Sequence, residues 1–132
     1  MKRVAAFILV IILSMLTIHS VFASGIMPRA DEYYSDAGVA FTSAGLAVFT
    51  ATTTFQFDTL SVTSCTLQVK DGGRWSQAGT LAPPSHVVRN RFTYAAEKNY
   101  SSSCSSGNTY RIVATFNADG HTITKASGEV AF

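Results

Sequence analysis

The chain has 132 residues, of which 10 are Lys or Arg and 8 are Asp or Glu, so its formal net charge is +2. The excess comes from Lys2 and Arg3, which precede an apolar run, and the rest of the chain balances its charges. Charge therefore gives no reason to expect a nucleic-acid partner, and the length allows one domain with a modest core.

The N-terminus has the layout of a secretory signal peptide. Two basic residues are followed by the apolar run Val4–Ile18, and Val21-Phe22-Ala23 offers residues that signal peptidase reads. We expect a signal helix over 1–23, cleavage between Ala23 and Ser24, and a secreted protein, free or associated with the cell surface. The alternative is an uncleaved leader that holds the protein at the membrane, since a few more apolar residues would make the run long enough to span.

Residues 24–37 show no regular apolar period, so we expect a flexible lead-in to the domain. Three carboxylates in this region, Asp31, Glu32 and Asp36, have a spacing that matches no calcium-binding loop. The sequence therefore predicts no metal site.

The clearest strand signal runs from Thr63 to Lys70. Thr63, Cys65, Leu67 and Val69 alternate with more polar residues, which is the period of a strand with one face in a core. Asp71-Gly72-Gly73 then predicts a tight hairpin turn, after which Arg74-Trp75 begins the returning strand.

Residues 38–132 as a whole favour strands. Besides the strand above, we expect strands near 39–42, 46–55, 75–81, 89–95, 110–116 and 121–132, with a turn at Asp58-Thr59, a break at Pro83-Pro84 and a hairpin turn at 118–120. About seven short strands without a helical period after the leader predict an all-β antiparallel sandwich over 38–132. A small closed barrel is the alternative.

The two cysteines, Cys65 and Cys104, predict a disulfide because the chain is expected to be exported. The bond would close a loop of about 40 residues and would stabilise the domain by about 4 kcal/mol in the chain-entropy model. A metal pair or a reactive thiol has no support, because no Cys-x-x-Cys or His-Cys spacing is present.

Tyr110 stands just after a loop, near the start of a late strand, like the tyrosine of an immunoglobulin-type corner. In the immunoglobulin pattern a cysteine follows that tyrosine by two residues, whereas Cys104 precedes Tyr110 by six. The predicted disulfide is therefore not the usual bridge between the two sheets.

The chain also resembles a class of small secreted proteins of unknown function from Gram-positive bacteria. The shared features are the leader, the Leu67-Gln68 strand followed by Gly73-x-Trp75, and the Tyr110-Arg111-Ile112 strand with a hairpin after it. The serine-rich loop that contains Cys104 departs from the pattern. The resemblance implies an immunoglobulin-like sandwich and implies no activity.

The sequence contains few residues and motifs that are typical of a catalytic site. His86 and His121 are the only histidines outside the leader. There is neither a Gly-x-Ser-x-Gly elbow nor a phosphate-cradling glycine motif. We therefore expect no enzyme and no cofactor, and a small secreted hydrolase is kept only as an alternative.

A binding or adhesion module is the interpretation that we adopt. Exposed aromatic side chains stack on sugar rings or anchor partner proteins, and the candidates are Trp75, Tyr94 and Tyr100. The partner would be a cell-surface glycan or protein, with the membrane contacted only through the leader. Two alternatives remain: the tryptophan packs inside the sandwich, or the chain is a structural protein that assembles through the edge of its last strand.

Overall fold

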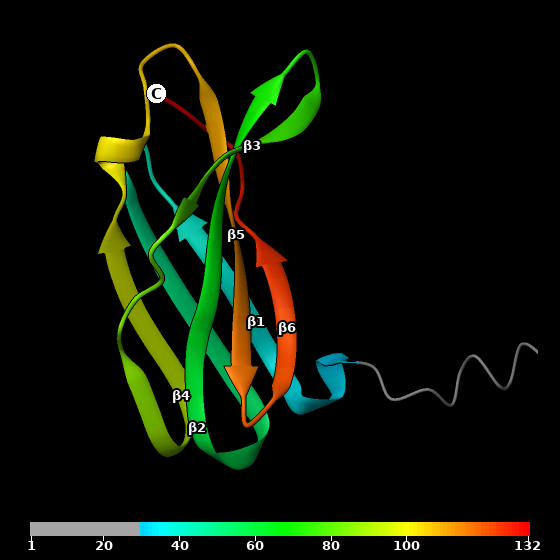
Figure 1. Cartoon of the computed structure of the whole chain (residues 1–132). Helices are drawn as coiled ribbons and strands as arrows, with labels where there is room; N and C mark the ends of the chain where they lie inside the picture. Colours follow the sequence, from blue (N-terminus) through cyan, green and yellow to red (C-terminus); the bar gives the residue numbers. More distant parts are fainter. Residues whose placement is uncertain (1–29) are drawn as a thin grey trace, which may run out of the picture.

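The structure, a computed structural model, describes residues 30–132 (Figure 1). The expected signal helix over 1–23 and the cleavage site between Ala23 and Ser24 lie outside the described residues. No helix among residues 30–132 is long and apolar enough to cross a membrane. Strand β1 begins at Tyr34, inside the segment expected to be a flexible lead-in, because the Tyr34 ring is buried in the core.

Strands and two short 3-10 turns (η1 and η2) account for all the regular structure of the described residues, so the prediction of an all-β domain is confirmed. The elements are η1 (Ala30–Tyr33), β1 (Tyr34–Phe41), β2 (Leu46–Asp71), β3 (Arg74–Leu81), β4 (Val87–Asn99), η2 (Ser101–Ser103), β5 (Thr109–Ala118), β6 (His121–Ala126) and β7 (Val130–Ala131). All pairings between these strands are antiparallel.

The long strand β2 joins the whole sheet together. Its first segment (46–57) pairs with β1 and β4, and its second segment (59–71) pairs with β3, with β5 and with the start of β4. The strands expected at 46–55 and 63–70 are therefore parts of one strand, and Asp58-Thr59 lies within it rather than in a turn. β6 and β7 add to the far side of β5.

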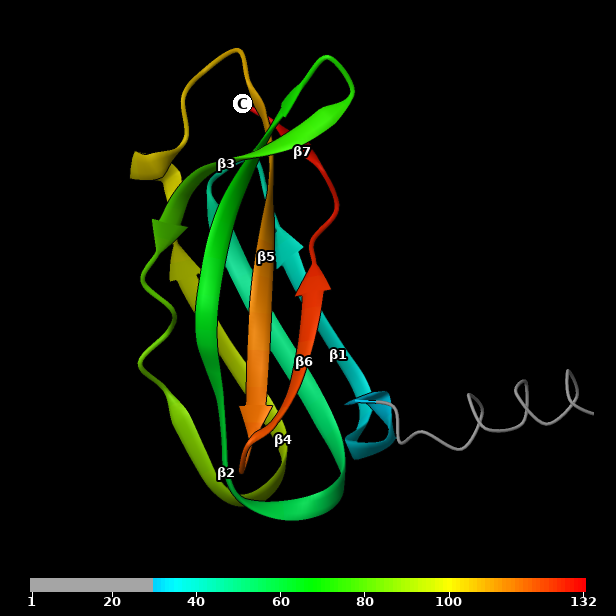
Figure 2. The same ribbon diagram turned by 45° about the vertical axis from the view of Figure 1, so that its right-hand side comes forward.

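One hydrogen-bonded sheet of seven strands folds over on itself at two neighbouring bends. The pairing of β2 with β4 shifts register between Thr52 and Phe57, and β4 turns at Asn90, which has a φ of 53°. Two layers face each other as a result: β1, the first segment of β2 and most of β4 form one, and β3, the second segment of β2, β5 and β6 form the other (Figures 1 and 2). Among the described strands no pairing joins β1 to β6 or β3 to β4, so the closed barrel is excluded.

The core fills the space between these layers. Tyr94 meets Phe116 edge-on across it, with ring centroids 6.2 Å apart, and the Tyr34 hydroxyl donates to the His121 carbonyl at 2.7 Å. Burying a side chain the size of phenylalanine contributes about 1.5–3 kcal/mol. The largest fully buried side chains are Tyr94, Phe49, Phe116, Leu60, Leu67, Ile112 and Cys65.

The predicted disulfide needs correction, because Cys65 and Cys104 are both free thiols. Cys65 is fully buried on β2, whereas Cys104 follows η2 and is half-buried against the core. Burial raises the pKa of Cys65 to about 11 and also raises the pKa of Cys104, so both are protonated near neutral pH. The prediction relied on compartment and cysteine count, and neither fixes the narrow geometry that a disulfide requires.

Candidate functional site

Trp75 lies on β3 directly after the hairpin that joins β2 to β3, at the end of the domain opposite to the bends (Figure 1). Gly72 and Gly73 form the turn with φ angles of 57° and 84°, which side chains other than glycine rarely adopt. This turn pairs Trp75 with Lys70. The indole is half-buried, so part of the ring remains open to solvent.

Arg111 of β5 packs on the Trp75 ring, and its guanidinium carbon lies 4.4 Å from the ring centroid. The Arg111 Nε atom also donates to Oε1 of Gln68 at 2.7 Å, across the pairing of β2 with β5. The guanidinium group is therefore held in place from two sides, and the cation–π contact in turn restrains the indole.

Lys70 adds a second cation to this surface. Its Nζ lies 6.0 Å from the Trp75 ring centroid and donates to Oε2 of Glu129 at 3.0 Å. The Lys70–Glu129 pair is too exposed to add much stability, since such pairs contribute about 0–1 kcal/mol. We call these five residues, Trp75, Arg111, Gln68, Lys70 and Glu129, the Trp75 surface.

The Trp75 surface brings together several kinds of group that can contact a ligand. It combines part of an aromatic ring with guanidinium and ammonium donors and with amide and carboxylate acceptors. Such a set can stack on the apolar face of a sugar ring or anchor a protein side chain while its polar groups bind hydroxyl or carbonyl groups.

The other two predicted aromatic candidates belong to the core. Tyr94 is 2% exposed and its hydroxyl donates to the His86 carbonyl at 3.1 Å, while Tyr100 is 5% exposed and donates to the Ala82 carbonyl at 2.6 Å. Burial raises the pKa of both hydroxyls. Their rings are thus unavailable for stacking on a ligand, and Trp75 is the candidate that remains.

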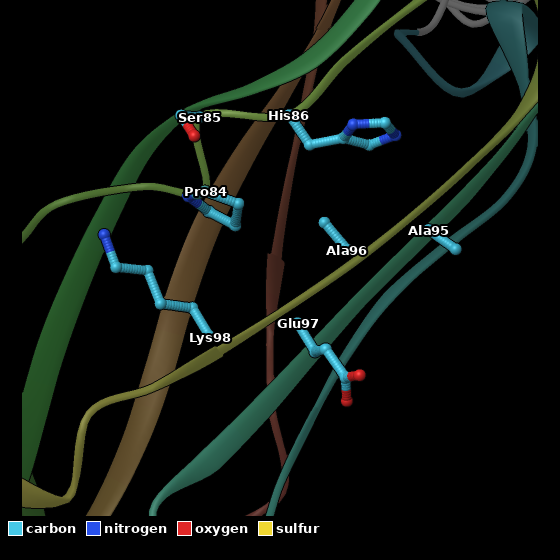
Figure 3. A pocket seen from close by; sticks show the side chains of 7 residues that line it. All are labelled: Pro84, Ser85, His86, Ala95, Ala96, Glu97 and Lys98. Atoms are coloured by element: carbon cyan, nitrogen blue, oxygen red, sulfur yellow. The ribbon is translucent and has the colours of Figure 1, made fainter.

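A shallow hollow of about 330 Å³ opens at the free edge of β4 (Figure 3). Pro84, Ser85 and His86 form one side of it, and the β4 residues 95–98 form the other. Its volume is near the lower limit for a small-molecule pocket, and the hollow is open rather than enclosed.

The titratable groups of this hollow do not converge. In Figure 3 the Glu97 carboxylate points away from the His86 ring, and the Lys98 side chain leaves β4 on the side opposite to Glu97. The pairing of an acid with a base that general catalysis needs is therefore missing from this hollow. Within residues 30–132 no group of three His, Cys, Asp or Glu side chains is placed to hold a metal ion.

Sequence reasoning missed Gln68 and Arg111 as members of the Trp75 surface. Their contact joins residues 43 positions apart in the chain, and no local pattern indicates it. The exposed Phe55 and Phe92 are also absent from the predicted candidates, because each lies within an expected strand. The signal for Phe55 was its place just before the turn expected at Asp58-Thr59, since β2 shifts register between Thr52 and Phe57.

No protein-family model and no curated protein matches this chain. The resemblance to small secreted proteins of Gram-positive bacteria therefore stays a prediction. What the fold and the Trp75 surface define is a class: an all-β domain that presents an aromatic ring fixed by a cation on the outer face of one layer.

Proposed function

We propose that this chain is an exported, non-catalytic binding or adhesion module that recognises a cell-surface glycan or protein through the Trp75 surface. The observation that carries the proposal is the half-buried Trp75 ring, part of which is open to solvent, with the Arg111 guanidinium held 4.4 Å from its centroid. A ring that is restrained before binding loses little entropy when a ligand stacks on it.

An immunoglobulin-like sandwich is the fold that we propose for this module. The correspondence counts the two segments of β2 as separate strands. One layer then matches strands A, B and E of that fold, with β1, the first segment of β2 and β4 in that order. The other layer matches strands C, F and G, with the second segment of β2, β5 and β6 in that order. The Tyr110 hydroxyl supports the assignment, because it accepts a hydrogen bond from the Ser105 backbone N–H, five residues upstream, at 2.9 Å. A tyrosine corner makes the same kind of contact.

Export rests on the N-terminal leader and not on the cysteines. The basic residues and the apolar run Val4–Ile18 favour secretion, and an extracellular position fits a module whose partner is on a cell surface. A disulfide would be independent support for an oxidising compartment. Cys65 and Cys104 are free thiols, so they give no such support.

A glycan is the partner that we would test first. Sugar rings present an apolar face to indoles and hydroxyls at their rim, and the groups around Trp75 include both donors and acceptors for such hydroxyls. A protein partner would use the same ring as an anchor in a larger interface.

The test is binding of the full chain, as an exporting host releases it, to an array of cell-wall and cell-surface glycans. We expect Trp75→Ala to weaken binding by about tenfold or more, as loss of a central aromatic anchor does. Phe55→Ala is the matched control, because it removes an exposed aromatic ring at the other end of the domain. Equal binding by Trp75→Ala and the parent would show that the glycan proposal is wrong.

A further inference from the structure

Strand β4 (Val87–Asn99) pairs with β2 along one side only. No other strand of the described residues pairs with it, so its second side is a free edge of the sheet, as Figure 1 shows. The N–H and C=O groups along such an edge can hydrogen-bond to a strand of another chain. β4 is also the longest strand with a free edge, since it has 13 residues, whereas β1 and β3 have 8 each and β6 has 6.

The middle of this edge lacks the features that usually prevent pairing between chains. Edge strands are commonly protected by proline, by lysine or by a covering loop. Residues 92–97 contain neither proline nor lysine, and Phe92 is 48% exposed. The neighbouring segment 82–86 contacts β4 through the Tyr94 hydroxyl, which donates to the His86 carbonyl, but no backbone hydrogen bond of the described residues joins that segment to β4. The edge at 92–97 is therefore open to a second strand.

Side chains alternate between the two faces of β4. Tyr94 is buried in the core, so Phe92 and Ala96 share this inner face with it. Arg91 and Glu97 are exposed on the outer face, and neither forms a salt bridge within residues 30–132. Figure 3 shows the Ala96 and Glu97 side chains leaving β4 on opposite sides. This part of β4 thus presents one cation, one anion and one exposed aromatic ring to a second chain.

The charges of β4 match those of a second copy of the same strand. If two β4 strands pair antiparallel about a two-fold axis at Tyr94, residues equally far before and after Tyr94 lie opposite each other. Arg91 and Glu97 are each three positions from Tyr94, so each Arg91 faces the Glu97 of the other copy. The symmetry makes this contact twice, and opposite charges directly across a strand pair stabilise the pairing.

Neighbouring registers of the two strands fit less well. Shifting the axis to Ala95 sets Glu97 opposite Thr93 and gives up both charge pairs. Shifting it to Thr93 sets Glu97 opposite Arg89, which lies beyond the bend at Asn90, where φ is 53°. The first axis is therefore the one that pairs both charges within the straight part of β4.

The apolar groups on the inner face match about the same axis. Phe92 and Ala96 are each two positions from Tyr94, so the Phe92 ring of one copy lies opposite the Ala96 methyl group of the other. Ala96 lines the open hollow of about 330 Å³ between β4 and the 84–86 segment. A large ring therefore meets a small side chain next to free space, and each copy covers the exposed phenylalanine of the other.

We propose that this chain forms a symmetric homodimer through antiparallel pairing of its β4 strands about Tyr94, with Arg91 on Glu97 and Phe92 on Ala96 of the second copy. The pairing of residues 90–98 extends over about 30 Å and makes one continuous sheet from a layer of each copy. A single pair of strands gives a narrow interface, so the dimer forms reversibly and depends on concentration. Trp75 is on β3, outside the pairing, so the dimer carries two Trp75 surfaces.

Charge reversal tests both the dimer and its register. Sedimentation velocity of the full chain, as recovered from an exporting host, is measured over a concentration series. Glu97→Arg sets arginines opposite each other, and Arg91→Glu sets glutamates opposite each other, so we expect each single variant to dimerise at least about tenfold more weakly than the parent. The combined Arg91→Glu/Glu97→Arg variant should dimerise like the parent. An equimolar mixture of the two single variants should form a heterodimer, because every charge then faces its opposite.

Asp36→Arg is the control, since it reverses an exposed carboxylate on the edge strand β1 and should leave dimerisation unchanged. Circular dichroism and thermal unfolding confirm that each variant keeps the parent's fold. A parent that stays monomeric throughout the series overturns the dimer. A dimer that neither single reversal weakens, or that the combined reversal and the mixture do not restore, overturns the pairing through β4. Glycan binding through Trp75 is measured on other variants, so neither result decides the other.

Discussion

The Arg111 guanidinium carbon lies 4.4 Å from the centroid of the Trp75 ring, and Arg111 also donates to Gln68. Two strands that are far apart in the sequence are therefore connected on the outer face by a cation–π contact. Because the ring is half-buried, we expect this contact to contribute about 0.5–1 kcal/mol to the free energy of unfolding.

A double-mutant cycle measures that contribution. Trp75→Ala, Arg111→Ala and the double variant are unfolded in urea, and the coupling free energy should be about 0.5–1 kcal/mol. A second cycle that combines Trp75→Ala with Arg74→Ala is the control, since neighbouring side chains on a strand point to opposite faces and should show coupling near zero. A Trp75–Arg111 coupling no larger than that of the control would contradict the contact.

Phe116 and Phe92 provide a matched test of the core. Phe116 is fully buried on β5 and meets Tyr94 across the layers, whereas Phe92 is 48% exposed. We expect Phe116→Ala to lower the free energy of unfolding by about 3–5 kcal/mol and Phe92→Ala to change it by less than about 1 kcal/mol. Urea denaturation checks both values, and similar losses would show that the layers do not pack as described.

Asp119 should make the stability of the domain fall at acidic pH. Hydrogen bonds from the N–H group of Asp58 and from Thr59 hold the pKa of the Asp119 carboxyl below its ordinary value. A carboxyl whose pKa is lower in the folded state stabilises the fold at pH values above its unfolded-state pKa of about 3.9. This stabilisation is lost as the pH falls through its folded-state pKa.

We therefore expect Asp119→Asn to lower the thermal midpoint at neutral pH and to narrow the difference in midpoint between neutral pH and about pH 3. Asparagine tolerates the φ of 48° at this position, so the substitution does not strain the turn. Asp36→Asn, which changes an exposed carboxylate of β1, should keep the parent's pH dependence. If both variants behave like the parent, the hydrogen bonds to Asp119 do not stabilise the fold.

The two thiols should differ in their rate of alkylation. Cys104 is half-buried and Cys65 is fully buried with a pKa of about 11, and only the thiolate reacts. Iodoacetamide should modify Cys104 first in the folded protein and both residues after unfolding, as followed by intact mass. A chain two hydrogens lighter that takes up no label after unfolding without reductant would contradict the free thiols and restore the Cys65–Cys104 disulfide.

The alternation of residues predicted individual strands well where both faces had distinct environments. Tyr110, Ile112 and Phe116 are buried on β5 as expected, and the hairpin before Trp75 is in place. Thr63 was expected in the core and is exposed, because a register shift between Val62 and Ser64 reverses the faces of β2 there. A bulge of this kind has no signature in the apolar pattern alone.

The candidate site was only partly predictable for a related reason. The sequence placed Trp75 beside a hairpin and put Gln68 on an outward face, but their contact with Arg111 depends on the pairing of β2 with β5. Tyr94 faces inward because β4 covers the open side of the core, which local composition does not reveal. Side-chain type predicted candidates, while the pairing between distant strands decided which of them reach solvent.

β2 hydrogen-bonds to β1, β3, β4 and β5 and runs through both layers without a break. Because β2 belongs to both layers, neither layer can stay folded without it. We therefore expect the two layers to unfold together. Unfolding should then be a single all-or-none step. Folding should be slow for a domain of this size, because the pairings of β2 with β4 and with β5 join residues that are far apart in the chain.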